Sequence, residues 1–424
     1  MTRRARKGHR GGAHRRRWRA VVAGLGTWAA LLGGGLAGAA PAQGAAPSVR
    51  FHAADTLAPG VVYREFSLSS SHGTAHGHLV SVDLKHPRVA MDLVHPGAVG
   101  ARAPLSRLAD ARGAVAAVNG DFFNISEAQH PGVEATGAPV GPAVAGGRRL
   151  KAAVPAGQRF GPALPPGTGT EDVIGVGTDG RGRLDRLTLR GEVAGPHGKL
   201  PLRGLNQYAV AVGGVGAFTP DWGTASRVRA TCGTDTDRSA PCSTETYEVT
   251  VRKGRVAAVA DRPGAGAVAK GSVVLVGREA GARELRRLRV GDPVRVTHRL
   301  LGTSKAAMRF AIGGFPIVRD NRPLAGLDTV TAAVRTAAGV GEKGRRFHLL
   351  ALDGAPEHRS GLTVGELAEV MRAVGAEDAV NLDGGGSSTL VARGPGEQRV
   401  SVRNHPSAGA ERAVPNGIGV FTRT

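Results

Sequence analysis

Short apolar runs that alternate with polar residues fill much of the chain, and they predict β-strands. The two-residue period is clear in His78–Leu84 and in Val89–Val94, and strand-like runs begin near Val61. Successive side chains of a strand point to opposite faces, so this period is typical of a sheet with one buried face. The apolar segment Ala114–Val118 predicts a further strand, which stops abruptly at the polar residues Asn119-Gly120-Asp121.

Helical periods occur at only three places in the sequence. A short helix is expected at Leu105–Ala111 and a charged one at Ala282–Leu288. The clearest is Val364–Val374, where apolar residues recur every three or four positions along one face. Thr363 precedes this segment and Glu366 follows three residues later, which is the pattern of a capping box.

The texture changes in the middle of the chain. Residues 130–170 are rich in Gly and Pro and predict long loops, and residues 171–300 consist of short β-runs separated by Gly and Pro. We therefore expect a β-rich insertion at 171–300 that carries no obvious chemistry. Its strands are expected at Asp185–Leu189, Tyr208–Val212, Tyr247–Arg252, Val256–Val259, Ser272–Val276 and Val294–His298.

The C-terminal part has the most regular pattern. Arg346–Leu352 and Ala379–Leu382 flank the Val364–Val374 helix, which predicts a β-α-β unit whose strands are parallel or otherwise neighbours in one sheet. Further strands are expected at Arg309–Ile312, Thr331–Thr336 and Ile418–Phe421, with Arg335 near the end of the second. The whole pattern predicts an α+β fold: a mixed sheet with few helices, plus a β-rich inserted subdomain.

The N-terminal 42 residues resemble a leader. They contain nine Lys or Arg residues and no Asp or Glu, followed by the apolar run Ala20–Ala40 and the small residues Ala40-Pro41-Ala42. This order is typical of a secretory signal peptide, although the apolar run is also long enough for a membrane anchor. Its Gly33-Gly34-Gly35 stretch is weakly hydrophobic and favours cleavage, and the arginines before Trp18 hint at the twin-arginine route.

Removing that segment changes what the charge implies. The formal net charge of the whole chain is +22, and without the leader's nine basic residues it is +13. The remaining arginines are dispersed among acidic residues and no nucleic-acid-binding motif accompanies them, so nucleic acid is not an expected partner. We expect a secreted protein with no stable membrane anchor after cleavage, with a linker at 43–60 and one catalytic domain assembled from 61–170 and 301–424.

The two cysteines, Cys232 and Cys242, lie in a polar stretch with no flanking histidine. Two thiols alone make a poor zinc site, and nothing marks either as a nucleophile. In an exported protein they predict a local disulfide with a structural role.

The candidate chemistry begins directly after the strand Ala379–Leu382, where the sequence reads Asp383-Gly384-Gly385-Gly386-Ser387-Ser388-Thr389. Glycines permit positive φ angles, so successive backbone N–H groups could converge on an anion, and the hydroxyls add further donors. A flexible turn would explain the glycines alone equally well. The neighbouring carboxylate favours a binding site for a phosphate or for sugar hydroxyls. No P-loop spacing is present.

Two other strand ends have the same form. Asn119 and Asp121 follow one apolar strand, and Asp353 follows another. Each could be a simple Asx turn, but three such endings on one sheet predict a shared cleft. Arg335 lies in an apolar run, where its guanidinium suits a carboxylate or a phosphate. The Glu411–Asn416 ending, with Arg412, could orient the same cleft or form a weak surface pair.

These segments, taken in order, resemble the phosphodiester glycosidase family. The resemblance covers roughly Val61–Leu150 and Arg309–Phe421, and several motifs in one order are more specific than any single motif. Asp121 departs from the family pattern, in which Gly is common. The motifs that carry the resemblance are Asn119–Phe123, Arg335–Ala337 with Gly339 and Val340, Leu352–Gly354, Asn381–Thr389 and Glu411–Asn416.

The resemblance implies hydrolysis of a sugar-1-phosphodiester, with a phosphate-bearing glycan or cell-envelope polysaccharide as substrate. Asp383, Asp353 and Arg335 are the expected catalytic residues, with Asp383 as nucleophile, base or electrostatic stabiliser. Carboxylates could also bind a divalent cation, but no dense ligand spacing identifies one, and the cofactor stays unknown. Substrate binding is expected from Asn119, Asp121, Gly384, Gly385, Gly386, Ser387, Ser388, Thr389, Arg412 and Asn416.

Two other functions fit the same cleft. A non-catalytic cell-wall or polysaccharide-binding protein would bind phosphate-bearing glycans and release them intact. A metal-dependent phosphodiesterase would lose activity with a chelator and would be indifferent to the sugar. Carboxylates at strand ends are needed less by a pure binding module, which favours an enzyme.

Overall fold

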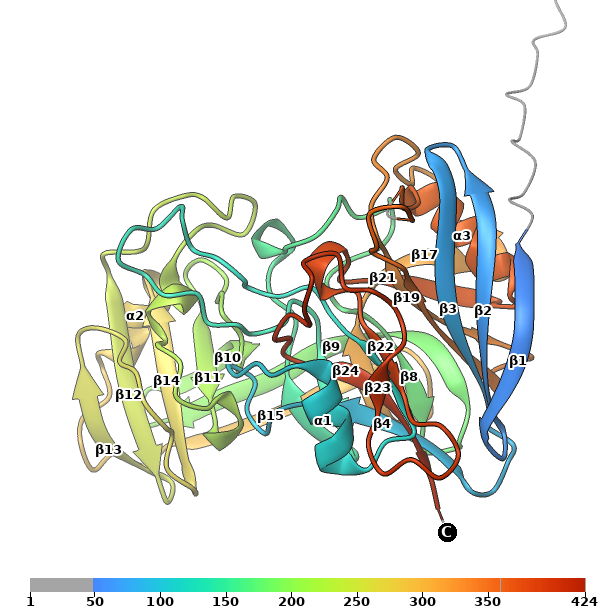
Figure 1. Cartoon of the computed structure of the whole chain (residues 1–424). Helices are drawn as coiled ribbons and strands as arrows, with labels where there is room; N and C mark the ends of the chain where they lie inside the picture. Colours follow the sequence, from blue (N-terminus) through green and yellow to red (C-terminus); the bar gives the residue numbers. More distant parts are fainter. Residues whose placement is uncertain (1–48, 359, 424) are drawn as a thin grey trace, which may run out of the picture. The chain divides into compact units, whose positions relative to one another are not determined.

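The computed structural model describes residues 49–358 and 360–423. The expected signal peptide, 1–42, lies outside these residues. The described chain forms strands β1 to β24 and three α-helices, arranged in three sheets (Figure 1). No helix in this part of the chain is long and apolar enough to cross a membrane.

An eight-stranded sheet joins the two ends of the chain. Strand β3 pairs with β20, so the N-terminal strands extend a sheet whose other members come from the C-terminal part. In sheet order the strands are β1 (Arg50–Ala58), β2 (Val61–Ser70), β3 (Gly73–Asp83), β20 (Arg346–Leu352), β19 (Thr336–Gly341), β21 (Asp378–Leu382), β17 (Phe315–Arg319) and β18 (Arg322–Pro323).

A five-stranded sheet makes the same kind of join. Strand β5 lies between β22 and β24, and helix α1 (Leu105–Arg112) buries Leu105 and Leu108 against this sheet. The strands in order are β23 (Ser401–Val402), β22 (Leu390–Ala392), β5 (Ala116–Asn119), β24 (Gly417–Thr422) and β4 (Val89–Val94).

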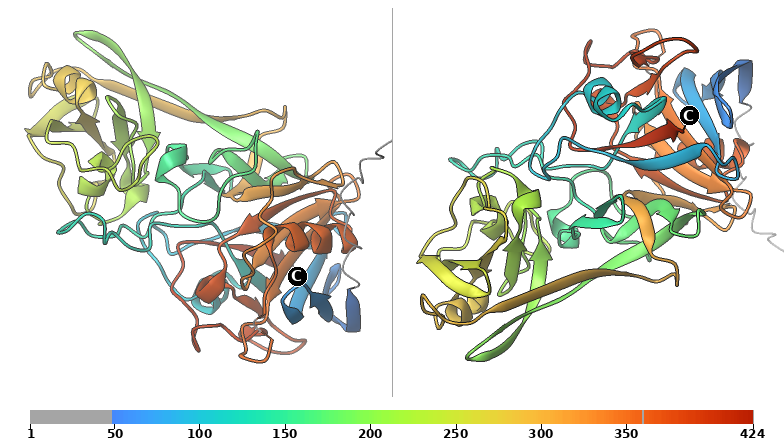
Figure 2. Two further views of the ribbon diagram at one scale, coloured as in Figure 1. Left: turned by 90° about the horizontal axis from the view of Figure 1, so that it is seen from above. Right: turned by 90° about the horizontal axis from the view of Figure 1, so that it is seen from below.

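The third sheet has eleven strands and contains the β-rich middle of the chain. It is mixed, because β10 and β11 pair in parallel while its other pairs are antiparallel. Strand β15 (Arg295–Gly302) pairs along β9, and the two run side by side in Figure 2. The remaining order is β13 (Arg255–Ala260), β12 (Thr246–Arg252), β14 (Ser272–Arg278), β11 (Val215–Phe218), β10 (Gly198–Leu205), β9 (Gly182–Gly195), β8 (Asp172–Gly177), β16 (Met308–Gly313), β6 (Ala143–Ala145) and β7 (Arg148–Lys151).

Helix α3 (Val364–Ala373) connects β20 to β21. Its N-terminus carries the capping box that its sequence predicts: the Thr363 hydroxyl accepts from the Glu366 backbone N–H, and the Glu366 carboxylate accepts from the Thr363 N–H. Both β20 and β21 pair antiparallel with β19, so they are parallel to each other and separated by β19. The expected β-α-β unit is therefore present, with one strand inserted between its members.

The strand that leads to Asp383 is buried on both faces. Ala379 belongs to the apolar cluster beneath α3, while Val380 and Leu382 belong to the largest core cluster on the opposite face of the sheet. Because both faces of this strand pack against buried apolar side chains, the position of Asp383, which follows it, is fixed.

Some segments differ from the sequence-based expectation. Residues 50–58, expected within a linker, form β1. The expected strand Tyr208–Val212 is absent: Tyr208, Ala209 and Val210 are buried in a loop, and Val212 is exposed. Residues 331–335 precede β19, so Arg335 lies just before a strand rather than at its end. An apolar sequence indicates that a segment is buried, and a buried loop can have such a sequence just as a strand can. Few helices and mixed sheets confirm the α+β fold class.

Candidate active site

A cavity of about 250 Å³ lies at the end of β21. It brings together a charged side and an apolar side from segments that are far apart in the sequence. The charged side consists of Asp383, Arg335 and Arg412, with Gly384 and Gly385. The apolar side consists of Phe122, Phe123, Ile125, Phe160 and Gly161, which we call the apolar wall.

Backbone hydrogen bonds hold the three segments that meet at Asp383. The Asp383 N–H donates to the Gly120 carbonyl over 2.9 Å, and the Gly385 N–H donates to the Val334 carbonyl over 2.7 Å. The Asn119 amide donates to the Asp383 carbonyl over 2.7 Å. The ends of β5 and β21 and the segment before β19 are thus fixed to one another. The strand ends do not belong to one sheet as expected, because β5 is in the five-stranded sheet and β21 is in the eight-stranded sheet.

The Asp383 carboxyl is partly exposed at the cavity surface and has a raised pKa. Burial by surrounding protein raises its pKa to about 6, although a hydrogen bond from Ser387 and the positive charge of Arg412 act in the opposite direction. A carboxyl with this pKa is largely ionised at neutral pH and can still exchange a proton near it. It can therefore serve as a nucleophile, a base or a stabiliser of positive charge.

Two arginines face this carboxyl, and neither makes an ion pair with a carboxylate in the described part of the chain. Arg335 donates to the carbonyls of Leu362, over 3.0 Å, and Thr331, over 2.7 Å, and burial lowers its pKa. Arg412 donates to the Ser387 hydroxyl over 3.2 Å. Two positive charges beside one carboxylate leave the cavity lining net positive, which favours binding of an anion beside Asp383.

The glycines after Asp383 form a short 3-10 turn, Gly385–Ser387, rather than an open loop. Gly385 has a φ of 58°, which favours glycine, and a Cβ on Gly386 would clash with the guanidinium of Arg412. The Gly385 N–H is already bonded to Val334. Of the three backbone amides that the sequence offers to an anion, that of Gly385 is therefore engaged within the protein.

Several predicted binding residues lie inside the protein and do not line the cavity. The Asn119 side-chain oxygen accepts from the Thr336 hydroxyl, over 2.9 Å, and from the Thr389 N–H, over 3.0 Å. Ser388 and Thr389 are at most 1% exposed, and the hydroxyls of Thr336 and Ser388 lie 3.0 Å apart, within hydrogen-bond distance. These buried contacts hold in place the residues that follow the turn after β21.

Asp121 is also buried, and it does not line the cavity. Its backbone N–H donates to the Asn416 side chain over 3.1 Å, and its carboxylate accepts from the Gly141 N–H over 2.6 Å. Burial raises the pKa of Asp121, opposed by the charge of Lys151, whose own pKa burial lowers. The Lys151 ammonium donates to the carbonyls of residues 140, 141 and 152. Asp121 thus links the end of β5 to Asn416, which precedes β24, and to Gly141, which precedes β6.

Asp353 follows β20, two strands away from β21, and does not line the cavity. Burial disfavours its ionised form, but hydrogen bonds from His78 and His405 outweigh burial and hold the pKa of Asp353 well below its usual range. The His405 Nδ1 lies 2.9 Å from the carboxylate and the His78 Nε2 lies 3.3 Å from it. Asp353 is therefore an anion that holds two imidazoles.

The apolar wall was not predicted as a functional feature. Phe122 and Phe123 stand in the motif that predicted Asn119 and Asp121, and Phe122 stacks on Phe315 with ring centroids 4.6 Å apart. Their place in that motif was the available signal. Phe160 lies in a Gly/Pro-rich segment that carries no motif, so only the fold brings it to the cavity.

Larger cavities and another group of potential ligands occur elsewhere in the described chain. None of the residues that the sequence motifs predict for the site lines the cavities of about 670, 480 and 340 Å³. Among the residues described, the group of three potential metal ligands with close ligand atoms is His130, Cys232 and Cys242. The two cysteines are joined in the expected disulfide, which confirms that prediction.

Solved structures of two bacterial proteins share the fold. A hypothetical protein from Synechocystis has a TM-score of 0.66 and 20% identity, over 89% of this chain and 68% of that one. An exported protein from Burkholderia pseudomallei has a TM-score of 0.65 and 20% identity, over 89% of this chain and 97% of that one. The zebrafish N-acetylglucosamine-1-phosphodiester alpha-N-acetylglucosaminidase catalytic domain, auto-inhibited by its pro-peptide, matches with a TM-score of 0.43 and 13% identity over 89% of each chain.

No curated protein matches the chain. A family model does match, from residue 245 to residue 421, and it therefore contains Arg335, Asp353, Asp383 and Arg412. The match begins inside the β-rich region, earlier than the expected Arg309, and leaves the N-terminal strands outside. The resemblance is thus confirmed for the motifs that the match contains, whereas the Asn119–Phe123 motif lies outside it. The family that residues 245–421 match is that of the phosphodiester glycosidases.

Proposed function

We propose that this protein hydrolyses sugar-1-phosphodiesters at the cavity beside Asp383. The observation that carries the proposal is the ionisable, partly exposed Asp383 carboxyl facing two arginines that have no carboxylate partner among the described residues. Positive charge suits the phosphodiester, and a carboxylate suits the positive charge that develops on a sugar ring as its anomeric bond breaks. The family match over the same residues supports this reaction class.

In the proposed reaction the bond between the anomeric carbon and the phosphate oxygen breaks. Water supplies a hydroxyl to the anomeric carbon, and its second proton accompanies release of the phosphomonoester, which is a good leaving group. Asp383 acts as nucleophile, base or electrostatic stabiliser, while Arg335 and Arg412 hold the phosphodiester. We assign Asp353 a supporting role at the end of β20, because its carboxylate is occupied by His78 and His405.

The test is turnover of synthetic sugar-1-phosphodiesters by the wild type and by Asp383→Asn. We expect kcat/KM to fall by at least ~100-fold in the variant, the usual scale for removing a group that acts in the transition state. Wild-type-like turnover by the variant would contradict the assignment. Hydrolysis in heavy-oxygen water should place the label in the sugar, and label in the phosphate would mean attack at phosphorus.

Two further measurements distinguish this function from a polysaccharide-binding protein and from a metal-dependent phosphodiesterase. A ligand that binds and is recovered intact, with no product under any condition, would identify a polysaccharide-binding protein instead. Loss of activity with a chelator, together with indifference to the sugar, would identify a metal-dependent phosphodiesterase. The proposed substrate is a phosphate-bearing glycan or cell-envelope polysaccharide outside the cell, in keeping with the Cys232–Cys242 disulfide.

A further inference from the structure

The disulfide-closed segment 232–242 lies far from Asp383 in the sequence but packs against a segment that lines its cavity. It contains no helix or strand, and the Cys232–Cys242 bond closes it. Its partner is the segment 156–161, which ends in Phe160 and Gly161 of the apolar wall. A loop without regular structure depends on such a cross-link and on its side-chain contacts for its conformation.

Hydrogen bonds join the two segments. The Asp235 carbonyl accepts from the Gly157 N–H over 2.8 Å, and the Thr234 carbonyl accepts from the Gln158 side chain over 2.6 Å. Arg238 donates to the carbonyl of Arg159, immediately before Phe160, over 2.8 Å. A Cβ on Gly157 would clash with the backbone of residue 236, so the two backbones are in close contact.

Arg238 also contacts the wall directly. Its guanidinium carbon lies 4.0 Å from the centroid of the Phe160 ring, a short cation–π distance. One side chain of the disulfide-closed loop therefore fixes both the backbone before Phe160 and the ring itself.

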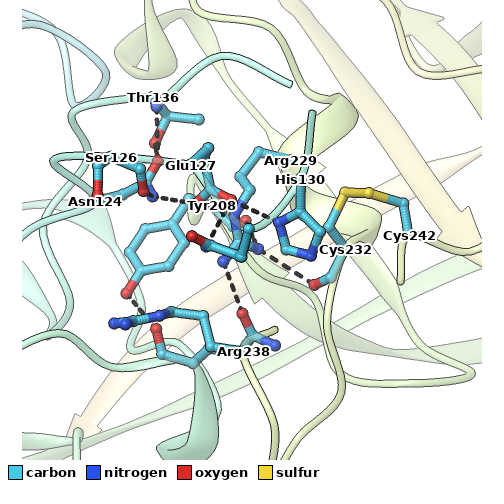
Figure 3. A network of polar contacts seen from close by, with 12 residues as sticks. Asn124, Ser126, Glu127, His130, Thr136, Tyr208, Arg229, Cys232, Arg238 and Cys242 are labelled. Carbon is cyan, nitrogen blue, oxygen red and sulfur yellow. Dashed lines mark hydrogen bonds and ion pairs between the residues drawn. A yellow bond between two sulfur atoms is a disulfide. The ribbon is translucent and has the colours of Figure 1, made fainter. Parts of the chain in front are cut away.

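A second connection reaches the other half of the wall through a buried ion pair (Figure 3). Arg229, three residues before Cys232, is fully buried and pairs with Glu127. Arg229 also donates to the side chain of Gln158 over 2.9 Å and to the carbonyl of Cys232 over 3.2 Å. Glu127 belongs to the loop that begins with Phe122 and Phe123.

His130 ties that same loop to the disulfide-closed segment. Its Nδ1 lies 2.7 Å from the Glu127 carboxylate (Figure 3). Its Nε2 lies 2.9 Å from the carbonyl of Ala240, which stands between the two cysteines in the sequence. Both halves of the apolar wall are thus held by residues within or next to segment 232–242.

We propose that the disulfide-closed loop 232–242 is a positioning element of the candidate active site, and that Arg238 sets the place of Phe160 in the apolar wall. This inference rests on the proposed function, because it assigns the wall to substrate binding at the Asp383 cavity. Arg238 is a positioning residue: it touches the wall and does not line the cavity. Loosening the loop displaces Phe160 and weakens substrate binding. The charged groups that carry out bond cleavage stay in place.

The kinetic test compares Arg238→Ala with Arg238→Lys on one sugar-1-phosphodiester. We expect Arg238→Ala to raise KM by ~10-fold, the scale of one lost cation–π contact and one hydrogen bond, with kcat within ~2-fold of wild type. Arg238→Lys keeps a cation and should restore part of the KM. The matched control is Arg286→Ala, which removes a cation 5.1 Å from the Tyr247 ring elsewhere in the β-rich region. An unchanged KM in Arg238→Ala, or an equal rise in Arg286→Ala, would overturn the proposal.

Hydrogen exchange tests the same coupling without any substrate. In Arg238→Ala, and in the double variant Cys232→Ser/Cys242→Ser, amides of 156–161 and 122–127 should exchange faster, whereas those of β21 should keep their protection. Unchanged exchange at 156–161 in both variants would refute the positioning role. If exchange at 156–161 becomes faster in these variants but the wild type hydrolyses no phosphodiester, the proposed function is wrong. The conclusion that the loop positions the apolar wall is then still supported.

Discussion

Three side chains define the charge of the candidate site: Asp383, Arg335 and Arg412. They lie at the end of β21, just before β19 and in the segment that precedes β24, and only folding brings them together. The Asp383 carboxyl is the one whose charge changes near neutral pH, since its pKa is raised to about 6. The arginines stay positive over the same range.

This difference predicts the pH dependence of the reaction. Each role proposed for Asp383 needs the ionised carboxylate, so kcat/KM should rise as pH increases through about 6 and level off above pH 7. A pH profile from 4.5 to 8 measures this, with Asp383→Asn as the control in which the same step should vanish. A profile that is flat across pH 6, or one that falls there, would contradict a role for the ionised form.

Gly386 offers a second test at this scale, because its lack of a side chain leaves room for Arg412. In Gly386→Ala the new Cβ would displace the flexible end of that guanidinium, which also holds Ser387. We expect KM to rise by ~5–10-fold with less than ~1 kcal/mol lost in stability, since the clash is with a flexible side-chain end. Gly169→Ala, where a Cβ has ordinary room, is the control. A large loss of stability without a change in KM would argue against this account.

Residues that carry a local signal could be predicted, whereas the contacts that long-range packing gives to a residue could not. Asp383 was identified because a carboxylate after an apolar strand is visible in the sequence itself. Asn119 was expected to bind substrate, yet its bonds to Thr336 and Thr389 depend on segments more than 200 positions away. Phe160 had no signal, since it contributes to the site only through the fold.

Among the elements, helix α3 was predicted from the apolar residues along one of its faces and from its capping box. Both signals come from residues that are close together in the sequence. Strand β1 was not, since its first seven residues are exposed and show no regular alternation of apolar and polar side chains. It belongs to the sheet through backbone pairing with β2. The insertion of β19 between β20 and β21 could not be derived from their sequence order. Short-range patterns specify elements, whereas pairing order depends on the complete chain.

The buried Arg229–Glu127 pair predicts how strongly the β-rich region is tied to the loop after β5. Arg229→Met should lower the free energy of unfolding by about 3–5 kcal/mol, because it leaves the Glu127 charge buried with one partner fewer. The double variant Arg229→Met/Glu127→Gln removes both charges and should recover part of this loss. Urea denaturation measures both values. A double variant less stable than Arg229→Met would show that the ion pair is not what the single variant breaks.

On the scale of the whole molecule, the N-terminal and C-terminal parts form shared sheets. The pairs β3 with β20 and β5 with β24 join residues of the 61–170 part to residues of the 301–424 part. The eleven-stranded sheet continues from the β-rich region into β16 and β6, so the region is joined to the rest by strand pairing.

The signal peptide expected at residues 1–42 gives a prediction about the whole chain. Cleavage after Ala42 should produce an exported protein whose N-terminal residue is Gln43. N-terminal sequencing or intact-mass measurement of protein collected outside the producing cells would check this. Replacing Ala40 and Ala42 by bulky charged residues should leave the precursor uncut, and a mature protein that still begins at its first residues would contradict a cleaved leader.

The pairing of β3 with β20 also constrains the time course of folding. Val82 lies opposite Phe347, so the β2–β3 hairpin acquires its sheet neighbour only after most of the polypeptide has left the ribosome. Until then one of its edges presents unpaired backbone groups, which is a hazard for aggregation. Contacts between such distant positions also slow folding. A chaperone that shields this edge during synthesis should therefore raise the yield of native protein more than one that acts on the completed chain.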